Sequence, residues 1–217
     1  MAGSVALDSL QGGRITEELG GSALYFSLSA SLLMPVRIIG PVGPDAEQLV
    51  RGRLALRAGI EAGGLEVVDA PTYRWFAEDA QGRNVDLGSL DSIYERWSPR
   101  VPSGYRGWAF VGSMRPDRQL EAVRALTGCG LLCADAMRSY VEADPAVAFE
   151  VLGLCDWYTA NEEEMAALGG AKPAEFRRRW GLAGVVVKRG PGGATVYTEA
   201  GEHHQPAMFN PPAVDTT

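Results

Sequence analysis

The chain has 217 residues, long enough for one large domain with a proper core, and its charged fraction of 22% is that of an ordinary globular protein. Twenty basic against 27 acidic residues give a net charge of −7, which argues against a nucleic-acid partner. No stretch reaches the roughly 18 apolar residues of a membrane-spanning helix. The three cysteines, Cys129, Cys133 and Cys155, lack Cys-x-x-Cys spacing and favour buried free thiols in a reducing cytoplasm over a metal site.

The first third of the chain alternates strand and helix patterns. Residues 4–8 predict a strand that ends in the carboxylate of Asp8, and residues 10–19 predict a short excursion from the sheet. Gly20-Gly21-Ser22 opens a helix to about Met34, whose apolar residues nearly encircle it and therefore predict deep burial. A strand at 36–40 and a helix at about 46–58, capped by Gly43-Pro44-Asp45, follow.

Residues 65–89 interrupt this alternation. Two polar-aromatic runs, 72–78 and 83–87, flank Ala80-Gln81-Gly82 and predict a β-hairpin with one solvent-exposed face. A small hairpin beside an α/β sheet is a candidate lid, together with residues 10–19. The pattern alone fits a plain edge hairpin equally well.

The remainder of the chain returns to regular strand–helix units. Strands are expected at 108–112, 130–135, 156–160, 184–188 and 194–198, with helices from Pro116, at 145–152 after the cap Asp144, at 161–168 and at 172–180. Such units predict an α/β fold with a doubly wound, mostly parallel sheet flanked by helices. Ligands of these sheets bind at the carboxyl ends of strands, where Asp8, Gly112, Asp135, Asn161 and Lys188 fall.

Three motifs accompany these elements, and each has a structural alternative. Gly20-Gly21 allows close backbone approach to an anion at a helix N-terminus, although a tight turn is favoured when the pair is taken alone. Asn161-Glu162-Glu163-Glu164 reads as a capping box, and its oxygens also suit Mg²⁺. The segment 188–193 is a glycine-rich turn that also fits a hairpin. No Walker A sequence occurs, which excludes P-loop NTPases.

In this order, the motifs resemble the ribokinase (PfkB) family of carbohydrate kinases. The resemblance rests on residues 19–26, 156–164 and 188–193 and on the final Pro211-Pro212-Ala213-Val214-Asp215-Thr216-Thr217. It implies ATP-dependent phosphorylation of a hydroxyl on a small sugar or sugar-like substrate. The family's substrate-binding positions match Asp8, Gly20 and Gly21. Its nucleotide- and phosphate-binding positions match Asp135, Asn161, Lys188, Gly190 and Gly193, and Glu164 would hold Mg²⁺ through water.

The family's catalytic base lies in a Gly-Ala-Gly-Asp motif that would begin directly after Thr217. The resemblance therefore implies no catalytic residue within 1–217, an incomplete ribokinase-like domain with negligible transfer activity, and uncovered apolar surface that favours self-association, for example as a homodimer. Two alternatives stay open: a non-catalytic sugar- or nucleotide-binding module, and a nucleoside kinase of the same family. Tyr25 leaves room for the latter, because many sugar-specific members carry a substrate-contacting asparagine there.

Overall fold

The computed structural model describes residues 1–11, 16–79 and 84–208. The chain divides into two compact units: Met1–Pro102 with Gly112–Ala122, and Ser103–Val111 with Val123–Thr217. The turn expected at Ala80-Gln81-Gly82 and the closing stretch 211–217 lie outside the described residues. The first unit contains a four-stranded sheet and a separate pair of strands, and the second contains a six-stranded sheet.

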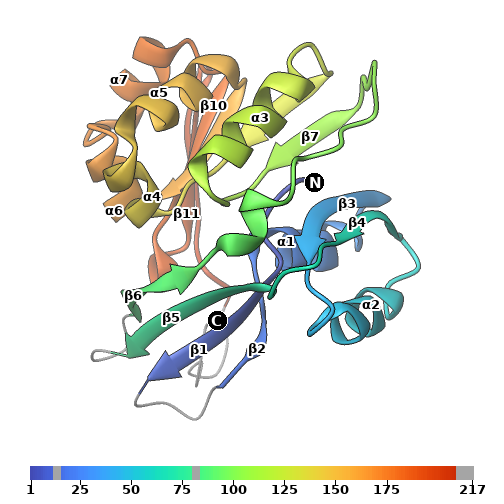
Figure 1. The fold of residues 1–217 in the computed structure, drawn as a ribbon. Coiled ribbons are helices and arrows are strands. Elements are labelled where there is room, and N and C mark those ends of the chain that lie inside the picture. The colour runs from blue at the N-terminus through green and yellow to red at the C-terminus, as the bar shows by residue number, and fades with distance from the viewer. Residues whose placement is uncertain (12–15, 80–83, 209–217) are drawn as a thin grey trace. The chain divides into compact units, whose positions relative to one another are not determined.

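A four-stranded sheet of the first unit carries Asp8. Its order is β2-β1-β5-β6, formed by β1 (Ala6–Gln11), β2 (Glu18–Gly20), β5 (Tyr73–Asp79) and β6 (Asn84–Leu90) (Figure 1). Strand β1 runs antiparallel to β2 and parallel to β5, and β5 and β6 form the antiparallel hairpin that the sequence predicts. Asp8 was expected at a strand end, and this is wrong. It lies inside β1, because β1 continues to pair with β5 as far as Gln11 opposite Glu78.

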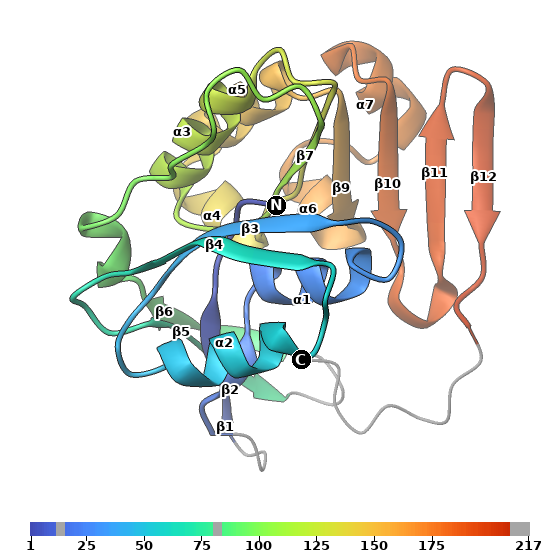
Figure 2. The same cartoon turned by 90° about the vertical axis from the view of Figure 1, so that its right-hand side faces the viewer.

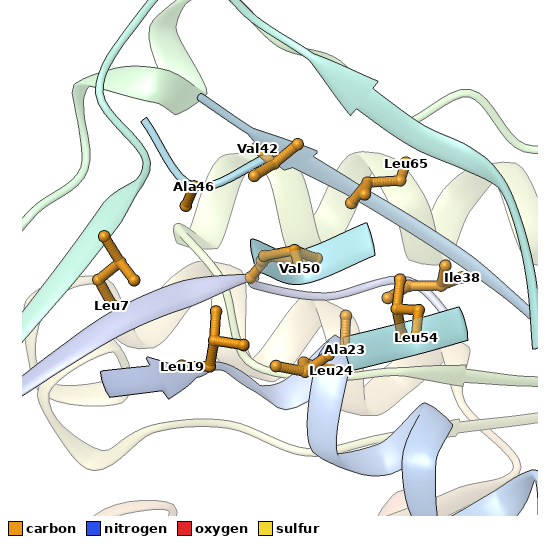
Figure 3. Packing of buried hydrophobic residues seen from close by; sticks show 11 residues of the cluster. Leu7, Leu19, Ala23, Leu24, Ile38, Val42, Ala46, Val50, Leu54 and Leu65 are labelled. Atoms are coloured by element: carbon orange, nitrogen blue, oxygen red, sulfur yellow. The ribbon is translucent and has the colours of Figure 1, made fainter. Parts of the chain in front are cut away.

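The rest of the first unit packs around one hydrophobic cluster. Strands β3 (Val36–Val42) and β4 (Ile60–Val67) pair in parallel, α1 (Ser22–Ala30) and α2 (Glu47–Ala55) are its helices, and η1 (Ser92–Glu95) is a 3-10 turn. Figure 3 shows apolar side chains from sheet, helices and β3 meeting at this cluster, which comprises Leu7, Leu19, Ala23, Leu24, Ile38, Val42, Ala46, Val50, Leu54 and Leu65 together with Val5. Leu7 and Leu19 therefore fix the buried face of the four-stranded sheet.

Two expectations for these helices are wrong. Helix α1 buries only the face with Ala23, Leu24 and Ser27, while Leu33 beyond its end is 89% exposed, because the helix stops at Ala30 and only one side meets the cluster. Asp45 does not cap α2. Its carboxylate instead accepts hydrogen bonds from the Thr72 hydroxyl at 2.6 Å and the Thr72 amide at 3.0 Å, tying the start of α2 to the segment before β5.

The second unit contains a six-stranded sheet of order β12-β11-β10-β9-β8-β7 (Figure 2). Strands β7 (Trp108–Val111), β8 (Leu131–Ala134), β9 (Trp157–Asn161) and β10 (Gly184–Lys188) are parallel, and β11 (Ala194–Thr198) and β12 (Gly201–Gln205) complete it antiparallel. Its helices are α4 (Arg138–Ala143), α5 (Pro145–Leu154), α6 (Glu162–Ala167) and α7 (Pro173–Trp180), whereas α3 (Pro116–Leu126) begins in the first unit and ends in the second. The predicted α/β class, with a mostly parallel sheet and flanking helices, is confirmed.

The cysteines are free thiols, as expected. Only Cys155 is buried, whereas Cys129 and Cys133 are partly exposed, so the expectation of burial is wrong for those two. In the part of the chain that the structure describes, no helix combines the length and apolar character needed to cross a membrane.

Candidate active site

Asp8 and Gly20 are in close steric contact on one face of the four-stranded sheet. A Cβ atom built on Gly20 would lie 1.9 Å from Oδ2 of Asp8, so the carboxylate occupies the space that any other residue at position 20 would fill. Asp8 is half-buried, and burial raises its pKa to about 6, because the charged form loses water. Among the described residues, no hydrogen bond or ion pair to this carboxylate offsets that loss. Its oxygens therefore remain available as acceptors.

Gly21 and the start of α1 are occupied by the chain itself. Gly21 has φ +97°, and a Cβ there would lie 2.4 Å from the carbonyl oxygen of Ser4. The amide of Ser22 donates to Oγ of Ser4 at 3.1 Å, and the amide of Ala23 donates to the Ser4 carbonyl at 2.9 Å. The first two amides of this helix are thus engaged by Ser4, which agrees with the tight turn favoured for Gly20-Gly21 taken alone rather than with an anion site at these amides.

Tyr25 stands at the position where the sequence leaves the sugar-kinase pattern. Its ring is 45% exposed, and its hydroxyl donates to the carbonyl oxygen of Leu19 at 2.8 Å. This bond connects α1 to β2 beside Gly20. Asp8, Gly20, Gly21 and Tyr25 consequently form one connected group, here called the N-terminal site, within the first unit.

In the second unit, Asn161 and Glu164 form the capping box that the sequence suggested. Oδ1 of Asn161 accepts from the Glu164 amide at 2.8 Å, and Oε2 of Glu164 accepts from the Asn161 amide at 2.7 Å. Glu164 is 8% exposed, and desolvation raises the pKa of its carboxyl, while the positive charge of Lys188 acts in the opposite direction. The motif therefore caps helix α6, and the positive charge of Lys188 stabilises the ionised form of the Glu164 carboxylate.

Three predicted residues lie at the ends of neighbouring parallel strands. Lys188 is the last residue of β10 and pairs with Asn161, the last residue of β9. Asp135 follows β8, the next strand in the sheet, and its amide donates to the carbonyl of Val111 at 3.2 Å. Because parallel strands end at one edge, the structure brings Asp135, Asn161 and Lys188 to that edge. With Glu164, they form the strand-end site.

Gly190 and Gly193 belong to the turn between β10 and β11. Gly190–Gly192 form the short 3-10 turn η2, and the amide of Arg189 donates to the Gly193 carbonyl at 2.8 Å. The turn joins two antiparallel strands, so the hairpin alternative describes its geometry. It follows directly after Lys188, at the edge of the strand-end site.

Two residues beside these sites were not foreseen. The Arg189 side chain donates to Oε1 of Glu162 at 3.0 Å and to the Thr195 hydroxyl, and so connects α6 to β11. Trp75 on β5 lies opposite Asp8, and its indole N–H donates to Oδ1 of Asp86 at 3.2 Å. The adjacency of Arg189 to Lys188 and the polar-aromatic run 72–78 were the available signals, but neither reveals a pairing across strands.

Known proteins resemble this chain in sequence and in fold. No protein-family model matches the chain. The ATP-dependent ribose-1-phosphate kinase of Halopiger xanaduensis is 28% identical over 205 residues, which cover 91% of this chain and 68% of that protein. Among solved structures, the nucleoside kinase of Methanocaldococcus jannaschii, an archaeal member of the ribokinase family, has a TM-score of 0.77 at 15% identity, covering 99% of this chain and 77% of that one. The chain has a ribokinase-type fold and resembles kinases of this family in sequence.

A second structural neighbour has inosine bound. The nucleoside kinase of Burkholderia thailandensis in complex with inosine has a TM-score of 0.76 and 17% identity, over 99% of this chain and 77% of that one. These structural likenesses establish the ribokinase-type fold for residues of both units. The family resemblance inferred from the motifs is thereby confirmed.

The strand-end site also fits the Mg²⁺ that the ribokinase family implies. Within residues 1–11, 16–79 and 84–208, no group of three or more His, Cys, Asp or Glu side chains could hold a metal directly. Mg²⁺ usually keeps several waters and takes one or two carboxylates plus substrate phosphates. Glu164, with one oxygen engaged by the Asn161 amide, offers such a limited contact.

Proposed function

We propose that this protein is an ATP-dependent kinase for a hydroxyl group on a small sugar-like substrate. The observation that carries the proposal is the Asp8 carboxylate, half-buried against Gly20, with no offsetting interaction among the described residues. A desolvated carboxylate accepts hydrogen bonds strongly, and adjacent hydroxyls of a sugar are donors of matching geometry. The ATP-dependent activity of the Halopiger xanaduensis relative supports the same reaction class.

Asp8 would bind and orient the acceptor. With a pKa near 6, its carboxylate is mostly ionised at pH 7 and can accept two hydroxyl protons in hydrogen bonds. Gly20 allows this placement, because its missing side chain is where the carboxylate lies. Holding the hydroxyl in a fixed orientation makes the bimolecular step effectively unimolecular. Such positioning is a main contribution of the protein to phosphoryl transfer.

The strand-end site would hold the phosphates. Lys188 supplies a positive charge at the end of β10, and Asn161 and Glu164 present oxygens at the start of α6. Mg²⁺ in water-mediated contact with Glu164 would neutralise charge on the nucleotide phosphates when bound. Asp135, Gly190 and Gly193 would border the nucleotide at the same strand edge.

The catalytic base is assigned to none of the described residues. The low transfer activity expected from the sequence stays a prediction. So do the lid role of residues 10–19 and 65–89, the homodimer and the cytoplasmic location. The lid segments do supply strands to the sheet that carries Asp8.

The test combines binding with turnover. Calorimetry would titrate the chain with MgADP and with inosine, ribose 1-phosphate or ribose, and a coupled assay would follow ADP release from MgATP. We expect Asp8→Asn to weaken acceptor binding at least about tenfold, as the loss of a charge-assisted hydrogen bond predicts, while MgADP binding is retained. Glu18→Gln is the matched control, because Glu18 is the exposed carboxylate opposite Asp8.

Three results would change the assignment. Binding of acceptor by Asp8→Asn as tight as by the wild type would remove the proposed role of this residue. Saturable acceptor binding without turnover in a chain that includes the Gly-Ala-Gly-Asp motif would favour a non-catalytic binding module. Absence of binding for every acceptor and for MgADP would refute the kinase proposal altogether.

A further inference from the structure

A row of four side chains crosses the four-stranded sheet through Asp8. Glu18 on β2 is paired with Asp8 on β1, Asp8 with Trp75 on β5, and Trp75 with Ser89 on β6. Residues that pair directly on neighbouring strands project from the same face of a sheet. The opposite face is the one that Leu7 and Leu19 bury in the hydrophobic cluster. Asp8 and Trp75 are therefore neighbours on the face that carries the N-terminal site.

The Trp75 indole is anchored at one edge. Its N–H donates to Oδ1 of Asp86 at 3.2 Å, and the same oxygen accepts the Gly88 amide at 2.8 Å, which fixes the carboxylate on β6. The indole N–H is thus already paired. Covering a tryptophan ring usually costs free energy when its N–H is buried without a partner. A ligand that covers Trp75 would avoid this cost, because the N–H keeps its hydrogen bond to Asp86.

Within the described part of the chain, the faces of the Trp75 ring make no aromatic packing contact, unlike those of Trp97 and Trp180. Trp97 is buried against Tyr94, and Trp180 stacks on Phe149 at 5.5 Å, so both serve packing. Among the ring and cation–π contacts of the described residues, none involves Trp75, which is half-buried. An anchored indole with accessible surface beside a hydroxyl-binding carboxylate is suited to stacking on a flat ligand ring.

We propose that Trp75 determines acceptor specificity by stacking on an aromatic base attached to the sugar that Asp8 binds, so that the acceptor is a nucleoside. The inference rests on the proposed function and narrows its substrate class. A bare sugar would satisfy Asp8, whereas a flat base attached to it would also offer a π face to the indole. One base–aromatic stack strengthens binding by about 10- to 100-fold, enough to separate the two classes of acceptor.

The decisive experiment compares three probes on two variants of Trp75. Trp75→Ala removes the ring, and Trp75→Phe keeps an aromatic face without the N–H. We expect Trp75→Ala to weaken inosine binding by about 10- to 100-fold and to change ribose 1-phosphate and ribose binding by no more than about twofold. Trp75→Phe should retain most of the inosine affinity. Trp108→Phe, at a 67% exposed tryptophan outside this sheet, is the matched control.

Fluorescence gives a readout that a merely structural role would not change. The chain has five tryptophans, and a base stacked on Trp75 should quench the emission of that one. Inosine should therefore quench wild type and Trp108→Phe, and the quench should disappear in Trp75→Phe while calorimetric binding persists. Persistence of the quench in Trp75→Phe would overturn the inference.

The outcomes separate this inference from the proposed function. Equal losses of inosine and ribose 1-phosphate binding in Trp75→Ala, or an unchanged inosine affinity, would overturn the role of Trp75 and leave the kinase proposal intact. So would a wild type that binds ribose 1-phosphate but not inosine. A wild type that binds neither probe in the presence of MgADP would overturn both proposals together.

Discussion

Gly20→Ala is the sharpest test of the N-terminal site, because the structure fixes the size of the perturbation. A Cβ at this position would lie 1.9 Å from Oδ2 of Asp8 and 2.3 Å from its Cγ, whereas real Cβ contacts essentially never fall below 3.0 Å. The carboxylate must therefore retreat by about 1 Å, which is enough to break hydrogen bonds whose donor–acceptor distances span only about 2.5–3.0 Å. Off-rotamer strain in Asp8 would cost only about 1 kcal/mol of folding stability.

The assay is acceptor affinity by calorimetry together with thermal unfolding. We expect Gly20→Ala to lose about 10- to 100-fold in acceptor affinity with a small change in melting temperature. Gly52→Ala is the control, because nothing lies within 4 Å of a Cβ at this position in α2 and the substitution should stabilise the helix by about 0.5–1 kcal/mol. In an Asp8→Ala background, Gly20→Ala should have no further effect on affinity, because the displaced group is gone. Wild-type affinity in Gly20→Ala would refute the steric argument.

Three further predictions concern titration, capping and the Arg189 network. Burial raises the pKa of Asp8 to about 6 in the folded state, so acceptor binding should fall as the pH drops below 6, where the carboxylate becomes protonated. Because the unfolded chain holds this proton less tightly, the free energy of unfolding should fall as the pH rises from about 4 to 6, and Asp8→Asn should lack both trends. Asn161→Ala should lower the free energy of unfolding in urea by about 1 kcal/mol, because the helix cap is lost. Asn161→Asp should restore this stability but not the MgADP affinity, and recovery of both would mean that the residue only caps the helix. Arg189→Ala should cost about 1 kcal/mol, because the buried Thr195 hydroxyl loses one of its two hydrogen-bond partners and keeps Nδ1 of His204 at 3.0 Å. Glu150→Gln, which breaks an exposed ion pair, should stay within about 0.5 kcal/mol, and equal losses for the two variants in chemical denaturation would contradict this.

Local signals in the sequence predicted local structure well. The caps at Asp144 and Asn161 are present, with the Asp144 side chain accepting the Val147 amide at 3.2 Å, because capping depends on residues three positions apart. The glycine turn after Lys188 and the β5–β6 hairpin were foreseen for the same reason. These features require no knowledge of distant segments.

Features that depend on distant partners were missed. Strand β4 contains Gly63-Gly64, which interrupts the strand pattern, and its place follows from parallel pairing with β3. The polar strand β12 exists because it pairs with β11. The position of Asp8 inside β1, the engagement of the α1 amides by Ser4, and the pairing of Trp75 with Asp8 all arise across strands. These features are stabilised by contacts with residues far away in the sequence, and the hydrophobic periodicity of a single segment does not show which residues those are.

The engagement of the first α1 amides by Ser4 has a consequence for how ligands are sorted by charge. With the Ser22 and Ala23 amides occupied, an anionic group near Asp8 would meet negative charge without those compensating donors. Neutral, hydroxyl-rich molecules suffer no such repulsion. The strand-end site has the opposite character, since Lys188 adds positive charge where phosphates would bind. Under the proposed function, each unit would therefore discriminate ligands by charge as well as by shape, and the phosphate of ribose 1-phosphate would have to lie away from the Asp8 carboxylate.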